Sequence, residues 1–469
     1  MVFSSLSFLL WFLPAALAAY YLLPRRFRNI VLLLFSLFFY AWGEPVYVLL
    51  MLGYIAMDYG FGRWIAAGLT AGNRRRSRHI LILAVILNIG LLGFFKYTDF
   101  LLSSLNSLFS LSLPMLELPL PIGISFYTFQ ALSYLIDLYR GEVELLRNPL
   151  DFGMYVTLFP QLIAGPIVRL KTIAGELRDR RETAALFASG VRRFTVGLGK
   201  KVLLANTAGA LWEEIGAADP TGLPALTAWI GLAAFTFQIY FDFSGYSDMA
   251  VGLGRMFGFR FPENFDHPYL SRSITEFWRR WHISLGTWFR EYVYIPLGGN
   301  RRGRGRQVLN LLIVWGLTGI WHGASWNFVV WGLFFGILLI LEKRFLLRTL
   351  ERLPRLLSWC YAMLLVMLGW VLFAHASLPE GIRYLAALFG SGAPASPLSL
   401  YYLSTNWLPF LLMALFSTDL PRRLCHRASA QVGENTLALA EPLVLSALLL
   451  LCVACLVDAT YNPFLYFRF

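Results

Sequence analysis

Charged residues are scarce in this chain. They make up 14% of its 469 residues, whereas a soluble domain carries about a quarter. Hydrophobic residues make up 58%, which is more apolar side chain than one soluble core can bury. The shortage of charge therefore excludes a soluble globular enzyme. It predicts an all-α, polytopic membrane protein that forms a single domain over residues 1–469.

Cysteine is also rare, and the four cysteines are too scattered to form a disulfide framework. Cys452 and Cys455 form a C-x-x-C, but the apolar run around them, residues 443–457, holds no second pair and no histidine to complete a metal site. We expect these cysteines to be packing residues, and we expect no metal centre. The sequence shows no internal repeat either, which argues against a transporter built from two matched halves.

No lysine or arginine precedes the first apolar run, residues 5–23, whereas Arg25, Arg26 and Arg28 follow it. A secretory signal peptide has the opposite charge order. Basic residues beside a span favour the cytoplasmic face, so the N-terminus is expected outside. The same rule explains the net charge of +13. Because no soluble basic domain is present, we expect no nucleic-acid partner.

Apolar runs near the ~20 residues needed to cross a bilayer recur along the chain. They are residues 5–23, 30–42, 46–65, 80–95, 122–138, 226–251, 308–320, 328–341, 356–373, 401–416 and 443–457. Basic clusters fall on one side at every second crossing, which predicts about ten to twelve crossings. The runs at 308–320 and 328–341 are expected to form a hairpin.

Three other stretches have a distinct character. Residues 98–119 hold no lysine or arginine and are expected to form an outer loop, whereas the basic residues 169–201 predict a cytoplasmic segment with short amphipathic helices. Residues 152–167 are apolar but are interrupted by two prolines and a glycine. Broken segments in a membrane occur only where they are buried in protein or line a cavity. We therefore predict a re-entrant segment and a buried polar cavity.

His322 is one of the few ionisable residues beside an apolar run. Such groups cost ~2.5–3.5 kcal/mol on insertion scales and usually face a functional interior. On a helical path His322 lies about 21 Å from the start of its run at residue 308. A neutral imidazole at that depth can accept a proton from a hydroxyl group, and Gly323 and Ala324 leave room for a substrate. A core histidine bonded to a carbonyl is the alternative interpretation.

His282 falls within a predicted amphipathic helix. Ser273 and Glu276 match a capping box at its start. Its apolar face consists of Ile274, Phe277, Trp278, Trp281, Leu285, Trp288 and Phe289. The pattern is typical of a helix that lies in the membrane interface. By itself it predicts an interfacial side chain at His282, which could reach only the inner end of a substrate.

Two acidic residues, Asp242 and Asp248, lie near the cytoplasmic end of the run at 226–251. We interpret them as structural groups that cap the helix end and form ion pairs with Arg255.

Five strings of this sequence resemble the membrane-bound O-acyltransferase family, in the bacterial branch that acetylates polysaccharides such as alginate. They are NFDHPYLSRSITEFWRRWHISLGTWFREYVYIPLGGNRRG at 264–303, WGLTGIWHGASWNFVVWGLFFG at 315–336, PIGISFYTFQALSYLIDLYRG at 121–141, NPLDFGMYVTLFPQLIAGPIVR at 148–169 and NPFLYFRF at 462–469. The D-alanyl branch of the family is similar around FWRRWHISL but lacks the continuation YIPLGGNR, which stands here at 294–301. The resemblance extends over nearly the whole chain.

The resemblance implies a site and a reaction. It implies that His322, in W-H-G, is the catalytic histidine and that His282, in R-W-H-x-S, is the second, more cytoplasmic one. It implies a ring of membrane helices around a funnel, in the bacterial inner membrane. The acyl group, expected to be acetyl, would pass from a cytoplasmic acetyl-CoA or acyl carrier thioester, with no bound cofactor. The acceptor would be a hydroxyl of an extracytoplasmic polysaccharide such as alginate, reached through a periplasmic partner acetyltransferase.

Several alternatives stay open at this point. D-alanyl or peptidoglycan acyl transfer fits the same fold, and a membrane transporter or a scaffolding subunit is the non-enzyme interpretation. The residues allow His322 to act as a general base or to form an acyl-histidine.

Overall fold

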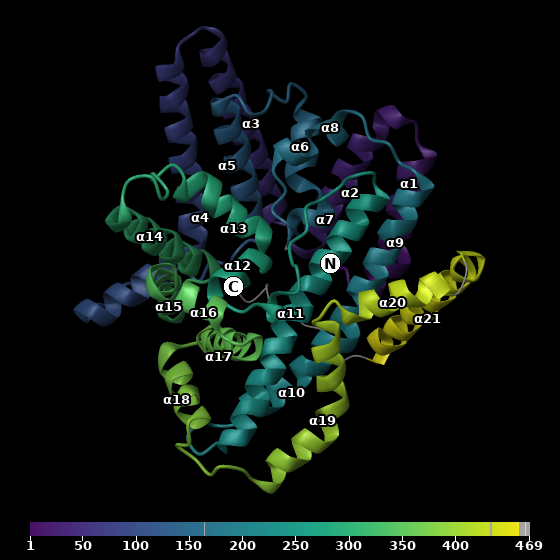
Figure 1. The fold of residues 1–469 in the computed structure, drawn as a ribbon. Coiled ribbons are helices and arrows are strands. Elements are labelled where there is room, and N and C mark those ends of the chain that lie inside the picture. Colours follow the sequence, from purple (N-terminus) through teal and green to yellow (C-terminus); the bar gives the residue numbers. More distant parts are fainter. Residues whose placement is uncertain (164, 432–433, 459–464, 466–469) are drawn as a thin grey trace. The chain divides into compact units, whose positions relative to one another are not determined.

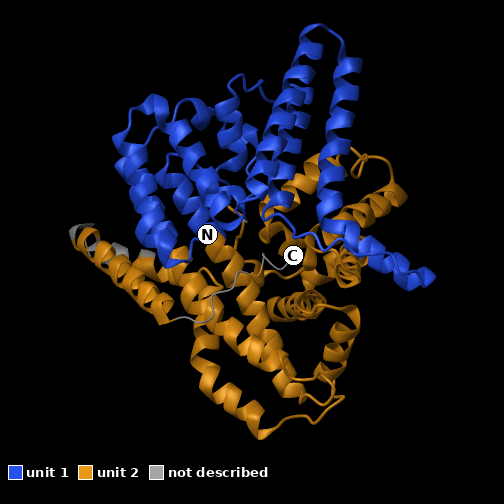
Figure 2. Cartoon of the chain, turned by 180° about the vertical axis from the view of Figure 1, so that it is seen from behind, with its two compact units in different colours: residues 1–194, 247–262 blue, residues 195–246, 263–469 orange. Residues whose placement is uncertain are grey.

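The computed structural model describes residues 1–469 except residues 164, 432–433, 459–464 and 466–469. Helices make up the fold, and no strand occurs in the described part of the chain (Figure 1). The chain divides into two compact units (Figure 2). Unit 1 comprises Met1–Phe194 and Ser247–Pro262, and unit 2 comprises Thr195–Tyr246 and Glu263–Phe469. The terminal string at 462–469 lies outside the described residues, apart from Leu465.

The helices up to residue 199 come in short and long pieces. In chain order they are η1 (Phe8–Phe12), α1 (Leu13–Leu22), η2 (Arg25–Phe27), α2 (Arg28–Gly43), α3 (Tyr47–Thr70), α4 (Arg74–Phe109), α5 (Ile124–Arg140), α6 (Pro149–Thr157), α7 (Phe159–Leu162), α8 (Leu170–Arg178) and α9 (Ala184–Gly199). The helices α8 and α9 confirm the amphipathic helices predicted for residues 169–201.

The helices from residue 200 onward also vary in length, from short turns to long apolar helices. In chain order they are η3 (Lys200–Ala205), α10 (Asn206–Gly216), α11 (Ala225–Met256), η4 (Pro268–Leu270), α12 (Ile274–Arg280), α13 (Ile283–Phe289), η5 (Arg290–Tyr294), α14 (Arg304–His322), α15 (Trp326–Leu341), η6 (Glu342–Leu346), α16 (Leu347–Arg352), α17 (Arg355–Ala374), α18 (Leu378–Leu388), α19 (Pro397–Phe416), α20 (Leu420–Gln431) and α21 (Glu434–Asp458). Each predicted apolar run from residue 226 onward lies within one of these helices.

Helix α4 is longer than the sequence pattern predicts. The sequence predicts an outer loop from residue 98, but the helix continues to Phe109 and ends where Ser110 adopts a left-handed φ of 52°. Residues 98–109 contain neither glycine nor proline, so no residue in this stretch breaks the helix. At 1.5 Å per residue the 36 residues of α4 extend over about 54 Å, well beyond a hydrocarbon core of about 30 Å.

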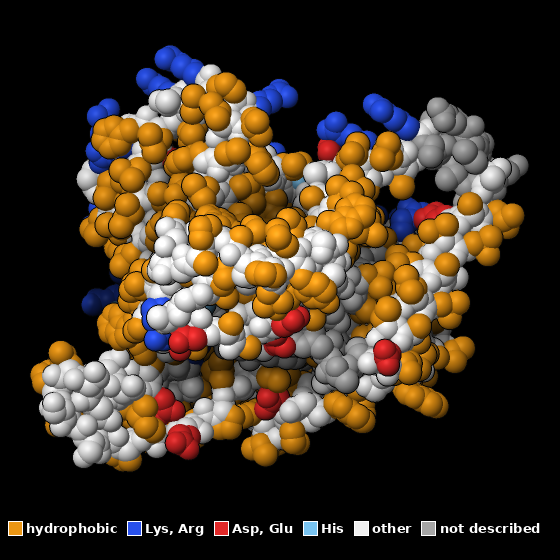
Figure 3. Space-filling model, turned by 90° about the horizontal axis from the view of Figure 1, so that it is seen from below, with side chains coloured by type: hydrophobic (Ala, Val, Ile, Leu, Met, Phe, Trp, Pro, Cys, Tyr) orange, Lys and Arg blue, Asp and Glu red, His pale blue; other side chains and the backbone are white. Residues whose placement is uncertain are grey.

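Within the described residues, five helices are long and apolar enough to cross a membrane. They are Arg74–Phe109, Ala225–Met256, Arg355–Ala374, Pro397–Phe416 and Ala438–Asp458. Large apolar side chains such as Trp11 and Leu22 are 78% and 84% exposed, and hydrophobic side chains cover much of the face drawn in Figure 3. Apolar exposure on this scale needs lipid to cover it. The chain is an integral membrane protein.

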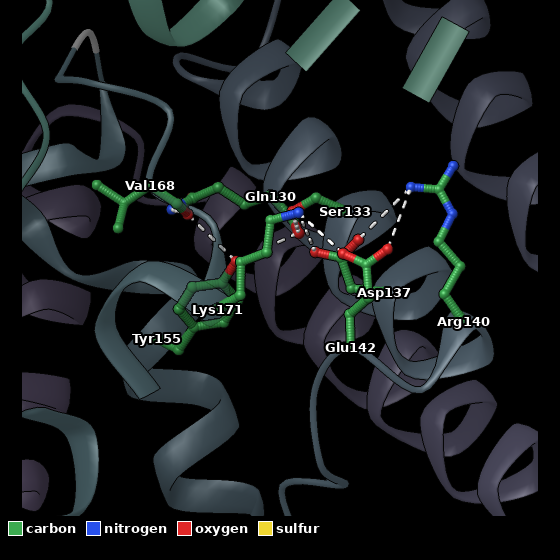
Figure 4. A network of polar contacts seen from close by, with 8 residues as sticks. All are labelled: Gln130, Ser133, Asp137, Arg140, Glu142, Tyr155, Val168 and Lys171. Atoms are coloured by element: carbon green, nitrogen blue, oxygen red, sulfur yellow. Dashed lines mark hydrogen bonds and ion pairs between the residues drawn. The ribbon is translucent and has the colours of Figure 1, made fainter. Parts of the chain in front are cut away.

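The interrupted stretch in unit 1 is a broken helix whose backbone is satisfied by protein groups. Between α6 and α7 the helix breaks, and the Phe159 amide donates to Ser36 Oγ at 3.0 Å. Gln161 Nε2 donates to the Tyr155 carbonyl at 2.6 Å, and the Tyr155 hydroxyl donates to the Val168 carbonyl at 3.2 Å (Figure 4). These contacts explain how non-helical backbone persists here, and they confirm the interruption predicted from the prolines.

Charged side chains hold the segment after this break to the end of α5 (Figure 4). Lys171 Nζ lies 3.0 Å from Glu142 Oε2 and 3.9 Å from Asp137 Oδ2. Arg140 lies 3.9 Å from Asp137 and 4.0 Å from Glu142. Because Asp137 is fully buried, its cationic neighbours offset the cost of desolvating the carboxylate.

Candidate active site

His322 is the last residue of α14 and is 4% exposed. The helix ends there because Gly323 adopts an extended conformation, with φ −163° and ψ 152°. Three aromatic rings surround the imidazole: Trp321 and Trp331 at 5.0 Å between ring centroids and Phe373 at 5.3 Å. His322 therefore lies in an aromatic, water-poor environment, in which a polar reaction is shielded from hydrolysis.

The hairpin of α14 and α15 brings this environment together, as the two apolar runs predict. Its helices touch at glycines: a Cβ on Gly319 would lie 2.3 Å from the Phe328 carbonyl oxygen, and a Cβ on Gly332 would lie 2.4 Å from the Trp315 carbonyl oxygen. Small residues at such crossings allow two membrane helices to approach closely. Gly319 of α14 and Gly332 of α15 thus place Trp331, on α15, against His322 on α14.

His282 does not lie on a continuous interfacial helix, and here the sequence-based prediction is wrong. The predicted helix breaks into α12 and α13, and His282 stands at the break with a left-handed φ of 45°. It is 2% exposed. The apolar residues keep the same helical spacing on both sides of the break. Periodicity alone therefore predicts one continuous helix. The predicted cap at Ser273 is present, although Glu276 accepts from the Arg272 amide at 2.9 Å.

Asn264 holds the break in place. Its backbone carbonyl accepts from the Ile283 amide at 3.0 Å. Its side-chain Oδ1 lies 3.2 Å from the Ser284 amide, 2.9 Å from Ser284 Oγ and 3.2 Å from His282 Nδ1. Asn264 itself is 1% exposed. Asn264 therefore contacts His282 and Ser284 through its side-chain amide and Ile283 through its backbone carbonyl.

The structure brings the two histidines to the same indole. The Trp321 ring centroid lies 6.0 Å from that of His282 and 5.0 Å from that of His322. The two distances add up to 11.0 Å, which is the upper limit on the separation of the imidazole centroids. Phe243 of α11 packs edge-on against His282 at 4.7 Å. The two imidazoles in unit 2 therefore contact one shared indole, that of Trp321.

Burial sets the protonation state of His282, which lies outside the five candidate spans. Removal from water penalises the imidazolium and lowers the pKa of His282 from 6.5 to about 3. The ring is consequently neutral near pH 7, and one of its nitrogens can accept a proton.

Glu342 fixes the start of the segment that carries His282. This fully buried carboxylate accepts from the Ile274 and Thr275 amides at 2.7 Å each and from the Thr275 hydroxyl at 2.6 Å. A carboxylate at a helix N-terminus is favoured by the amides and by the helix dipole. Since Glu342 directly follows α15, it ties α12 to the hairpin that bears His322.

Sequence reasoning identified the two histidines but missed Asn264 and Glu342. Asn264 opens the NFDHPY string, and Glu342 is an acidic residue directly after the apolar run at 328–341. An acidic residue at the end of an apolar run indicates a structural or functional role for Glu342. Its position in the sequence does not indicate that it caps a helix some 70 residues earlier.

The two aspartates near the end of α11 form ion pairs with Lys201 and Arg193, which agrees with a structural role, whereas the predicted pairing with Arg255 stays a prediction. In unit 2, Asp242 lies 2.7 Å from Lys201 Nζ, and both side chains are buried. Asp242 also accepts from the backbone amide of the buried residue Leu465 at 2.8 Å. In unit 1, Asp248 lies 2.7 Å from Arg193.

Comparisons with known proteins identify the family of this chain. The sequence model of the membrane-bound O-acyltransferase family matches residues 131–376, which include both histidines, Asn264 and Glu342. The chain is 39% identical to a "Probable alginate O-acetylase" of Azotobacter vinelandii over the full length of both. It is 35% identical to a peptidoglycan O-acetyltransferase of Helicobacter pylori, over 88% of this chain and 83% of the relative.

A more distant relative is a teichoic acid D-alanyltransferase of Streptococcus thermophilus, which is 28% identical over 48% of this chain and 57% of the relative. The names of these relatives describe acyl transfer to three acceptors, which are alginate, peptidoglycan and teichoic acid. From the family match over more than half of the chain and the full-length identity, this chain belongs to the membrane-bound O-acyltransferase family.

Proposed function

We propose that this protein transfers an acetyl group from a cytoplasmic thioester to hydroxyl groups of an extracytoplasmic polysaccharide such as alginate. The donor would be acetyl-CoA or an acyl carrier thioester, and no cofactor would stay bound. The observation that carries the proposal is the pair of buried histidines against Trp321. The full-length identity to a "Probable alginate O-acetylase" supports the choice of acceptor.

Acyl transfer needs one proton to move. The acceptor oxygen bonds to the carbonyl carbon, the carbon–sulfur bond breaks, and the hydroxyl proton passes to a histidine and on to the leaving thiolate. His322 would take the proton in this scheme. In the alternative route its ring attacks first, expels the thiolate and forms an acyl-histidine that the hydroxyl then resolves. The aromatic rings around His322 would exclude water in either route.

The setting we propose is the bacterial inner membrane, with the N-terminus outside. About ten to twelve crossings, among them half-membrane segments such as α6 and α7, would form a ring around a funnel open to the cytoplasm. The transfer would reach the polysaccharide through a periplasmic partner acetyltransferase. The basic residues between the spans support the orientation, because they cluster on alternate sides along the chain.

The test is acetyl transfer by the purified protein in proteoliposomes, with labelled acetyl-CoA inside and polymannuronate with the candidate partner outside. We expect His322→Ala to remove turnover at every donor concentration while the protein inserts and purifies as well as the wild type. His79→Ala, at an exposed histidine of α4, is the matched control and should keep full activity. Turnover by a folded His322→Ala protein would refute the role of His322.

Acceptor identity is tested in the same vesicles. Peptidoglycan fragments replace polymannuronate in a parallel reaction, because the Helicobacter pylori relative is a peptidoglycan O-acetyltransferase. Acetylation of the muropeptides alone would reassign the acceptor and keep the acyl-transfer chemistry.

A further inference from the structure

The orientation of the Asn264 amide is fixed by a backbone group. A backbone N–H can only donate, and the Ser284 amide lies 3.2 Å from one side-chain atom of Asn264. That atom must therefore be the oxygen, Oδ1, whichever way the amide could otherwise be flipped. The Ser284 hydroxyl, 2.9 Å from the same atom, donates to it as well.

This orientation decides where His282 carries its proton. Nδ1 of His282 lies 3.2 Å from the same oxygen, which has only lone pairs to offer. An unprotonated Nδ1 would place two lone pairs against each other in a buried site, so Nδ1 must carry the hydrogen. In a neutral imidazole the proton acceptor is then Nε2.

We propose that Asn264 is a positioning residue that holds His282 in the Nδ1–H form, so that Nε2 is the atom that accepts the proton or contacts the acyl group. This inference rests on the proposed acyl transfer. It makes His282 a member of the reacting centre and not a contact for the outer part of the donor. The same side-chain amide supports the left-handed turn at His282 through its bonds to Ser284, and the backbone carbonyl of Asn264 accepts from the Ile283 amide.

Two aromatic rings pack against the imidazole of His282 beside its contact with Asn264. They belong to Phe243 of α11 and Trp321 of α14. Neither of these side chains titrates, so neither responds to pH. A change of Asn264 to a carboxylate would thus introduce a new titrating neighbour beside Nδ1, which can be detected in a pH profile.

Kinetics of two variants test the proposal. Asn264→Ala removes the acceptor for Nδ1–H and should lower kcat by about 10²-fold or more, the scale of general acid–base catalysis, with the donor KM little changed. Asn264→Asp keeps an acceptor oxygen and should restore most of that loss at pH 8. Its negative charge favours the imidazolium and raises the pKa of His282 by about one to three units. Because protonated His282 accepts no proton, Asn264→Asp should lose activity on acidification at a higher pH than the wild type.

Asn310→Ala is the matched control. Asn310 is a fully buried amide of the same unit, and its side chain donates to the Leu297 and Gly299 carbonyls at 3.3 and 3.0 Å. It should lower thermal stability without moving the pH profile. Equal pH profiles for wild type and Asn264→Asp would overturn the proposal. An inactive wild type with every thioester donor would instead refute the proposed function, so the two failures are distinguishable.

A spectroscopic measurement covers the case in which Asn264 variants do not fold. Solid-state NMR of the ¹⁵N-histidine-labelled wild type, with the signals of His282 identified by their loss in His282→Asn, reads the tautomer directly. We expect a protonated Nδ1 and an unprotonated Nε2 near pH 7. A proton on Nε2 would overturn the proposal, whatever the activity data show.

Discussion

At the scale of single residues, the roles of the two histidines are the main question. His282 is buried and contacts Trp321, the indole that also contacts His322. We therefore expect His282→Asn to lower kcat at saturating donor with little change in donor KM. Asparagine is the suitable replacement because it tolerates a left-handed φ. Steady-state kinetics on purified protein provide the measurement, and near-normal kcat with a raised donor KM would restore the donor-side assignment.

The sequence predicts which residues carry the chemistry better than it predicts their environment. His322 stands out because it is a rare ionisable group at the end of an apolar run. The location of His282 could not be derived from its pattern, because the break at His282 depends on hydrogen bonds from Asn264, 18 residues earlier. The spacing of apolar residues around His282 cannot predict a hydrogen bond to a residue so far away in the sequence.

At the scale of elements, the α14–α15 hairpin offers the sharpest stability test. A Cβ at Gly332 would lie 2.4 Å from the Trp315 carbonyl oxygen, which is backbone and cannot rotate away. Gly332→Ala should therefore force the helices apart and cost about 1–3 kcal/mol, with a matching loss of activity as Trp331 moves off His322. Thermal unfolding in detergent, followed by size-exclusion chromatography, measures the effect.

The control for this prediction lies on the same hairpin. A Cβ at Gly316 of α14 would meet nothing within 4 Å. Alanine is the better helix former, so Gly316→Ala should leave stability unchanged or raise it by up to about 1 kcal/mol. Equal destabilisation by both substitutions would show that the close crossing of the hairpin is not what limits stability.

The sequence predicts the apolar helices, but it does not predict the polar contacts that connect them. Runs of apolar residues mark α2, α3, α5 and α11 because each must face lipid or protein over its whole length. The cap of α12 by Glu342 depends on tertiary contact between segments far apart in sequence. The extension of α4 to Phe109 shows the opposite failure, because a stretch without lysine or arginine predicts an outer loop although it holds no helix-breaking residue before Phe109.

At the scale of the whole molecule, the orientation in the membrane can be tested with reporter tags. A tag at Arg75, before the long helix α4, should read cytoplasmic, and a tag at Ser112, after it, should read outside. A tag at Arg304 should read cytoplasmic, because its loop is rich in arginine. Cysteine accessibility to an impermeant reagent in intact cells gives an independent reading. Arg75 and Ser112 on the same side would contradict the crossing by α4.

The anchoring of Leu465 on Asp242 affects how the protein can be handled in the laboratory. The Leu465 amide is buried against a carboxylate that is itself paired with Lys201. An affinity tag fused directly to Phe469 would begin four residues after this contact, and pulling Leu465 away would leave a buried carboxylate with one donor fewer. Purification handles are therefore better placed behind a long flexible linker or at an exposed position such as Ser112. A loss of yield in short-linker C-terminal fusions would then be a fault of the fusion site and not of the protein.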